Sequence, residues 1–143
     1  MKALARRFPA TLQIHFRDYP LDHQCNPRLT RPFHTRACSA ALYARCASEQ
    51  GRFWGYADLL SQNPRALDEP TLQGHAAALR LDQGRLRRCL AAKKTREGLD
   101  RDIRRGMELG VRGTPSFYFE GKLVGPKSLS RWIRAVEAAL AKR

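Results

Sequence analysis

A proline shortly before a run of aromatic residues is the feature that most limits how this chain folds. Pro115 follows Thr114 and precedes residues 117–119, Phe-Tyr-Phe, which otherwise read as a β-strand. Proline has no N–H to give to a sheet ladder, so within sheets it occupies first positions, edges and bulges. Gly113, just before the pair, indicates a backbone conformation that other residues would resist. We therefore expect a strand that begins directly after a specially shaped turn.

The length and composition are those of a globular domain. The chain has 143 residues, of which 43% are hydrophobic, and this suffices for a single domain, residues 1–143, with its own core. No stretch approaches the roughly 18 consecutive apolar residues that suggest a membrane span. Residues 1–16 lack the uninterrupted apolar core of a signal peptide. We expect a domain with no membrane span, which is cytoplasmic if Met1 is the genuine start.

The formal net charge of +14 favours contact with nucleic acid or with an anionic membrane. The basic residues are spread along the chain, however, and only residues 85–105 approach a continuous basic stripe. We interpret this stripe as a solvated helix face. A nucleic-acid-binding module is the alternative, which no recognisable binding motif supports.

The chain has four cysteines, and no two of them form a C-x-x-C pair. Cys38 and Cys46 fall on one expected helix, about 12 Å apart at the usual helical rise. A disulfide needs Cα atoms within about 7 Å, so these two cannot be bridged. We prefer a structural disulfide between Cys46 and Cys89, with Cys25–Cys38 as the second bridge. Free buried thiols are the alternative.

His23, Cys25, His34 and Cys38 form the one set of residues with metal-ligand spacing. They read H-x-C and then H-x-x-x-C, and zinc accepts such a mixed tetrahedral set. Two prolines interrupt the loop between the two halves of the set. We therefore expect no metal site, and no residue pattern points to a cofactor.

The elements expected from periodicity alternate between helix and strand. Residues 12–16 alternate apolar and polar side chains and predict a strand with one buried face. Asp68 and Asp82 are placed to cap two helices, and Gly51 and Gly110 to end two others. The remaining expected elements are helices over residues 2–7, 33–50, 53–62 and 95–109, strands over 117–119 and 123–124, and a closing helix over 129–140. The layout is an α/β fold with three strands, which looks one strand short.

Several short sequence segments, taken in order, resemble those of a known family. These are "FRDYPL" after the first expected strand, "CASEQGRFW" at the end of the first long helix, and "GVRGTPSFYFEGKLVG" near the end. Together they resemble the DsbA-like family of thiol–disulfide oxidoreductases, over about residues 3–140. The resemblance implies a thioredoxin-like fold with an inserted helical block at about residues 33–110.

The resemblance also explains the proline. In that family the proline ahead of the third strand is cis and faces the reactive disulfide, and Pro115 matches it. The residue before it, here Thr114, offers backbone groups that pair with an extended substrate. Gly113, Thr114 and Pro115 are therefore the expected substrate-binding residues, and an extended polypeptide is the expected partner. A membrane-bound redox partner is the second partner that the resemblance implies.

The family's first strand and its reactive C-x-x-C pair have no counterpart in this sequence. None of the four cysteines replaces that pair by spacing, so we assign no catalytic residue. The first strand is central in the family's sheet, and each buried backbone group left without a partner costs on the order of 1–3 kcal/mol. We expect that an upstream start was missed, with a degenerate remnant as the alternative.

The resemblance implies disulfide exchange in exported proteins and a periplasmic or other extracytoplasmic setting. Without the pair, the chain as written retains at most peptide docking, so its enzyme status stays open. A redox-inactive peptide-binding adaptor is one alternative function, and the basic nucleic-acid-binding module is the other.

Overall fold

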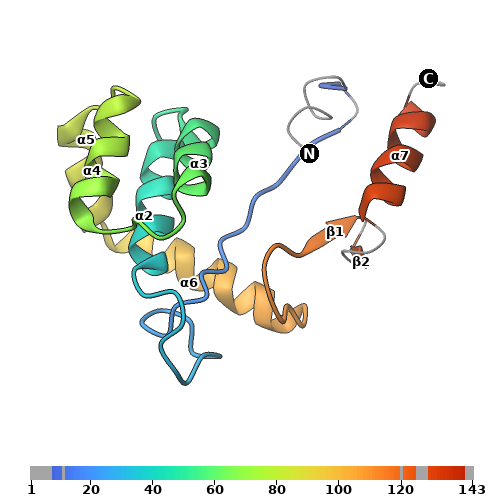
Figure 1. Cartoon of the computed structure of the whole chain (residues 1–143), viewed down its shortest axis with the longest axis horizontal. Coiled ribbons are helices and arrows are strands. Elements are labelled where there is room, and N and C mark those ends of the chain that lie inside the picture. The colour runs from blue at the N-terminus through green and yellow to red at the C-terminus, as the bar shows by residue number, and fades with distance from the viewer. Residues whose placement is uncertain (1–7, 11, 120, 125–128, 141–143) are drawn as a thin grey trace. The chain divides into compact units, whose positions relative to one another are not determined.

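The computed structural model describes residues 8–10, 12–119, 121–124 and 129–140, and the chain divides into two compact units (Figure 1). One unit combines Met1–Arg17 with Val111–Arg143, and the other is Asp18–Gly110. The single-domain organisation stays a prediction. The helical unit takes in the loop from Asp18 onward, which the sequence reading left outside the helical block.

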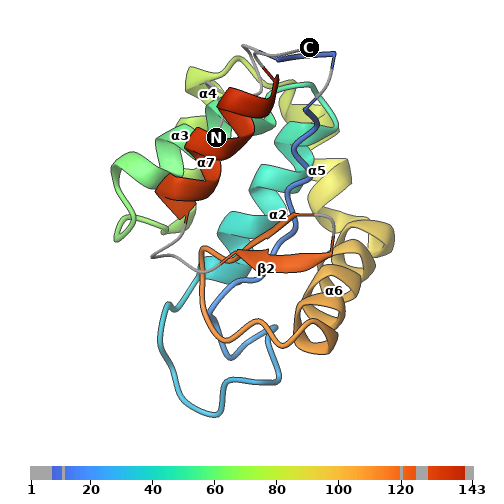
Figure 2. The ribbon, with the colours of Figure 1, turned by 90° about the vertical axis from the view of Figure 1, so that its right-hand side faces the viewer.

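The helical unit is built around its first helix, which is rich in alanine. That helix, α2, contacts each of the other four helices of the unit. Small side chains such as Ala40, Ala44 and Ala47 are buried and let neighbouring helices approach closely. Figure 2 gives a second view of the same helices. Their bounds are α2 Ala37–Ser48, α3 Phe53–Gln62, α4 Glu69–Ala78, α5 Gln83–Ala91 and α6 Lys93–Glu108.

Local signals set several helix ends, as the sequence predicts. Asp68 Oδ1 accepts a hydrogen bond from the Thr71 N–H at 2.9 Å, and Asp82 Oδ1 accepts one from the Arg85 N–H at 2.6 Å. These backbone hydrogen bonds lower the pKa of both carboxyl groups, because they favour the charged form. Gly51, which follows α2, has a φ of 70°, a left-handed conformation that glycine adopts without steric cost.

The start of α2 differs from the sequence prediction. The helix begins at Ala37, not near residue 33, because Arg36 has a φ of 77° and cannot continue a right-handed helix. The carboxylate of Asp22, which is fully buried, accepts a hydrogen bond from the Cys38 N–H at 3.2 Å. A loop residue therefore caps this helix from a distance, and Phe33 stays outside it with 65% of its surface exposed.

Helix α3 buries Tyr56, whereas Trp54 on the same helix is 39% exposed. His75 is half-buried and packs edge-on against the Tyr56 ring, with ring centroids 6.0 Å apart. Within the described residues, His75 Nε2 is buried with no hydrogen-bond partner.

The other unit contains a β-hairpin and a closing helix. Strand β1, Phe117–Phe119, pairs antiparallel with β2, Lys122–Val124, in a register that places Phe117 opposite Val124. Gly121 forms the turn with a φ of 78°. Helix α7, Leu129–Leu140, follows where the apolar stripe predicted it.

The prediction of a strand over residues 12–16 is wrong. The structure assigns no strand there, and the sheet of the described residues consists of β1 and β2. Alternating side chains supply one buried face, but a strand also requires a hydrogen-bonded neighbour, which the pattern alone does not provide. The helix expected over residues 2–7 lies outside the described residues. The absent central strand stays a prediction.

Candidate functional site

The residues expected to bind substrate lie together directly ahead of β1. The Thr114–Pro115 peptide bond is cis. Thr114 and Pro115 are exposed and Gly113 is half-buried. The Ser116 hydroxyl donates a 2.6 Å hydrogen bond to the Gly113 carbonyl oxygen and closes the turn on itself. The segment therefore presents backbone to solvent beside a strand.

An exposed backbone segment that leads into a strand has a recognised use. Extended peptides bind proteins by adding a strand, with main-chain hydrogen bonds supplying affinity and side-chain pockets supplying specificity. Phe117 and Tyr118 are half-buried, whereas Phe119 is 38% exposed. The arrangement offers an apolar border to the segment at residues 113–115 but contains no cysteine.

A buried ion cluster, which the sequence analysis missed, organises the helical unit. Arg45 Nη1 on α2 donates to Asp18 Oδ2 at 2.6 Å and to Asp102 Oδ2 at 2.8 Å. The backbone N–H of Asp18 also donates to Asp102 Oδ2, at 3.3 Å. Both carboxylates are buried, so the single guanidinium fixes the loop start and α6 to α2. An arginine between buried Ala44 and Cys46 was the available signal.

The cluster holds two carboxylates against one cation. Burial raises the pKa of the Asp18 carboxyl above its ordinary value, although the hydrogen bond and charge of Arg45 oppose this. The pKa of Arg45 is also raised, because the bonds to Asp18 and Asp102 outweigh its own desolvation. Desolvation of an ion without a full counter-charge disfavours its charged form. We interpret the cluster as structural.

All four cysteines are paired in the structure. Cys46 and Cys89 join α2 to α5 with an S–S distance of 2.08 Å, and Cys25 and Cys38 join the loop to α2 with an S–S distance of 2.20 Å. Both bridges lie in the helical unit, whereas Gly113–Pro115 belong to the other unit. The cysteines and the expected substrate segment are thus parts of different units.

The candidate metal ligands do not form a metal site in this state. The sulfurs of Cys25 and Cys38 are bonded to each other, so neither is available as a thiolate ligand. Among the described residues, no group of at least 3 His, Cys, Asp or Glu side chains is arranged to hold a metal ion. His23 instead lies 3.6 Å from the Asp22 carboxylate.

Curated proteins that resemble part of this chain are named as Na(+)/H(+) antiporters. Its sequence is 31% identical over 105 residues to the Na(+)/H(+) antiporter NhaA of Herminiimonas arsenicoxydans, a match that covers 73% of this chain and 17% of that protein. It is 34% identical over 109 residues to Na(+)/H(+) antiporter NhaA 3 of Salinispora tropica, covering 76% of this chain and 17% of that protein. The chain thus spans less than a fifth of the length of these curated relatives.

No helix of the described residues has the length and apolarity to cross a membrane. No solved structure matches the chain. The sequence model of a thioredoxin family, Thioredoxin_4, matches residues 13–138, which is most of the chain. This chain belongs to the Thioredoxin_4 family of thioredoxin proteins.

Proposed function

We propose that this chain is a DsbA-like domain that docks an extended polypeptide along Gly113, Thr114 and Pro115. The observation that carries the proposal is the segment Gly113–Pro115 directly ahead of β1, in which Thr114 and Pro115 are exposed, within a chain that belongs to a thioredoxin family. The peptide would pair with backbone groups of Thr114 in the manner of an added strand. The bordering aromatic residues of β1 would contact its side chains.

Thiol–disulfide exchange is the chemistry that the family suggests. This chain would dock the polypeptide substrate without carrying out the exchange itself. Exchange requires a thiolate that attacks a disulfide sulfur. The sequence contains no C-x-x-C pair, and its four cysteines are bridged within the helical unit. We therefore assign no catalytic residue. The paired cysteines favour an oxidising, extracytoplasmic compartment.

The first experiment separates docking from catalysis. Insulin reduction by dithiothreitol is followed by turbidity with and without the 143-residue chain. We expect no acceleration over the thiol background, because no C-x-x-C pair is present to cycle. Acceleration comparable to that of a thioredoxin would contradict the assignment of docking alone.

The second experiment tests where the peptide binds. A fluorescent unstructured peptide without cysteine is titrated with wild-type protein and with the Thr114→Ala and Thr114→Pro variants, and its anisotropy is recorded. Thr114→Ala keeps the backbone N–H and should bind as the wild type does. Thr114→Pro removes that N–H and should weaken binding by about tenfold, the effect of about 1.4 kcal/mol from one lost hydrogen bond. Circular dichroism of each variant controls for folding.

A second candidate function follows from the names of the relatives. The chain matches a stretch of proteins named Na(+)/H(+) antiporters that are several times its length. We propose as the second candidate that this domain works beside an antiporter domain and modulates its exchange. The test is Na⁺-driven proton release from vesicles that contain such an antiporter, with and without the added chain. Unchanged exchange would remove this candidate.

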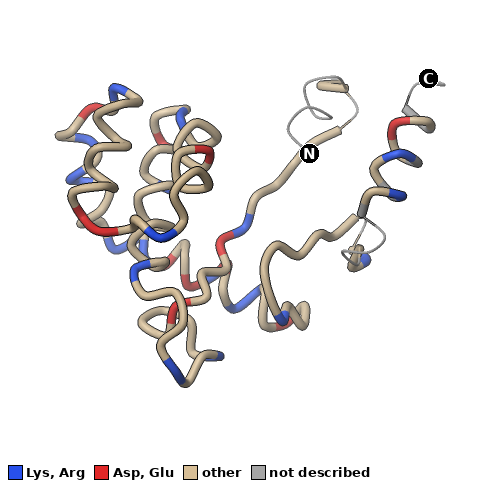
Figure 3. Tube along the Cα trace, in the orientation of Figure 1, with Lys and Arg blue, Asp and Glu red and all other residues tan. Residues whose placement is uncertain are grey.

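The nucleic-acid alternative stays a prediction. Figure 3 shows acidic residues interspersed with the basic ones along α6. Lys93 lies 3.5 Å from Glu97, Lys94 lies 3.3 Å from Glu49, and Arg105 lies 3.0 Å from Glu108. These ion pairs reduce the charge that the stripe offers to phosphate. If the chain does not bind DNA even at low salt, this alternative is excluded.

A further inference from the structure

The two disulfides differ in their access to solvent. Cys46 and Cys89 are buried, with 0% and 5% of their surfaces exposed, and they lie in the core between α2 and α5. In the other bridge Cys38 is buried, but Cys25 is half-buried and lines a pocket of about 280 Å³. A nucleophile can approach Cys25 through this pocket, whereas Cys46 and Cys89 both belong to the buried core cluster.

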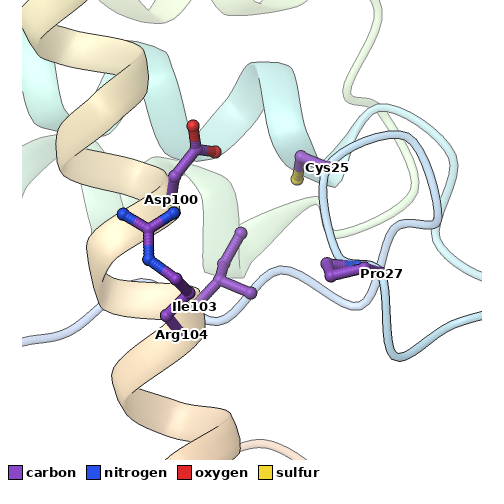
Figure 4. A pocket seen from close by; sticks show the side chains of 5 residues that line it. All are labelled: Cys25, Pro27, Asp100, Ile103 and Arg104. Atoms are coloured by element: carbon purple, nitrogen blue, oxygen red, sulfur yellow. The ribbon is translucent and has the colours of Figure 1, made fainter.

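The pocket lies between the loop and α6 (Figure 4). Cys25 and Pro27 form its loop side, and Asp100, Ile103 and Arg104 form the helix side. All five residues belong to the helical unit. The pocket therefore combines one cysteine of the Cys25–Cys38 bridge, an apolar wall and one charge of each sign.

We propose that Cys25–Cys38 is a redox site that exchanges with small thiols admitted to this pocket. The thiolate of a first small thiol attacks Cys25 Sγ, and the S–S bond between Cys25 and Cys38 breaks. Cys25 then carries a mixed disulfide, and Cys38 leaves as a thiolate that takes up a proton. A second thiolate attacks the sulfur of the bound small thiol and releases Cys25 as a thiol. Two small thiols are oxidised to one disulfide, and the protein disulfide is reduced to two thiols.

The surroundings of the bridge suit both redox states. The backbone carbonyl oxygen of Asp22 lies 4.0 Å from Cys25 Sγ and 3.8 Å from Cys38 Sγ. After reduction it can accept a hydrogen bond from either S–H, so neither thiol is left without an acceptor. Cys38 is the second residue of α2, and the N–H groups of a helix N-terminus stabilise a departing thiolate. The buried Asp22 carboxylate partly offsets that stabilisation.

The size and charges of the pocket limit which thiols can enter it. A volume of about 280 Å³ admits a small organic thiol and excludes a folded protein, which is why the site does not conflict with an inactive insulin assay. The Arg104 guanidinium attracts an anionic thiolate, and the Asp100 carboxylate repels it. The proposal is independent of peptide docking, which concerns residues of the other unit.

The test uses the wild-type chain. It is incubated with 2-mercaptoethanesulfonate, quenched in acid at successive times, alkylated with N-ethylmaleimide and digested for mass spectrometry. We expect Cys25 and Cys38 to be labelled at least about tenfold faster than Cys46 and Cys89, with the early mixed disulfide on Cys25. Equal labelling of both bridges, faster opening of Cys46–Cys89, or a mixed disulfide on Cys38 would overturn the proposal.

Charge variants test the pocket as the entry route. Arg104→Gln should slow opening of Cys25–Cys38 by about threefold, and Asp100→Asn should speed it by a similar factor, because both act on the approaching thiolate. Arg101→Gln, on the same helix but outside the pocket lining, is the matched control and should change the rate less. Equal rates in all three variants would contradict entry between the loop and α6.

Discussion

Arg45 Nη1 lies 2.6 Å from Asp18 Oδ2, although the two residues are 27 positions apart in the sequence. The same nitrogen lies 2.8 Å from Asp102 Oδ2 on α6. The contacts join the first residue of the helical unit to two of its helices. The boundary of that unit at Asp18 has a physical basis in this cluster.

Removing the cation should destabilise the helical unit strongly. Arg45→Met removes the cation that both buried carboxylates bind, and breaking a buried ion pair in this way costs about 3–5 kcal/mol. Urea unfolding followed by circular dichroism measures the loss. Arg96→Met removes an exposed arginine from α6 and should change the free energy of unfolding by less than about 0.5 kcal/mol. Similar losses in both variants would contradict a special role for Arg45.

The raised pKa of Asp18 gives a pH dependence with a definite sign. Its folded-state pKa lies above the unfolded value of 3.8, so the folded state binds the proton more tightly. The contribution of Asp18 to stability is therefore full below that value and is lost as pH rises through the folded pKa. Asp18→Asn cannot ionise, so relative to wild type it should gain stability as pH rises from 3.8 through the folded pKa of Asp18.

The control for that experiment has the opposite sign. The pKa of Asp68 is lowered by the Thr71 N–H, so its contribution is present above 3.8 and is lost as pH falls through the folded pKa. Asp68→Asn should therefore lose stability relative to wild type over the same rise in pH. Urea titrations at several pH values measure both trends. The same slope for both variants would show that the burial of Asp18 has no effect on its ionisation.

The space at Gly98 should prove essential to the cluster. A Cβ atom on Gly98 would overlap the guanidinium of Arg45, which cannot move aside without leaving Asp18 and Asp102. Gly98→Ala should lower the free energy of unfolding by about 1–3 kcal/mol, despite the better helix propensity of alanine. Gly74→Ala, in α4 with nothing within 4 Å of the added atom, should raise it by about 0.5–1 kcal/mol. Thermal unfolding of the two variants in opposite directions is the expected result.

The buried bridge should stabilise the unit more than the accessible one. Cys46–Cys89 spans 43 residues and Cys25–Cys38 spans 13. In the chain-entropy description, closing these loops stabilises the fold by about 4 and about 3 kcal/mol respectively. The Cys46→Ala/Cys89→Ala pair should therefore lose more stability in urea than the Cys25→Ala/Cys38→Ala pair. The reverse order would show that the loop before α2 matters more than the core bridge.

Features set by near neighbours in the sequence were predictable. Asp68 and Asp82 cap helices through bonds to residues only three positions on, so the signal lies within a few letters. The hairpin of β1 and β2 likewise follows from a glycine turn between two apolar runs. The Gly113–Pro115 segment stood out for the same reason, since one proline restricts its own surroundings.

Features that depend on distant partners were missed. The bonds of Arg45 cross 27 and 57 positions, and no periodicity reports such pairs. Asp22 caps α2 from 16 residues away, so the start of that helix was placed too early. The strand expected over residues 12–16 failed on the same ground, because alternation shows a face but not a neighbour.

One binding measurement shows whether an extended peptide docks at Thr114. Two extended peptides of the same sequence are titrated with the wild-type chain, one of them N-methylated at successive residues along one edge so that it cannot donate main-chain hydrogen bonds. We expect the unmodified peptide to bind and to shift the amide resonances of Gly113 and Thr114, and the methylated peptide to bind at least about tenfold more weakly. Equal affinity of the two peptides, or resonance shifts confined to Asp18–Gly110, would contradict it.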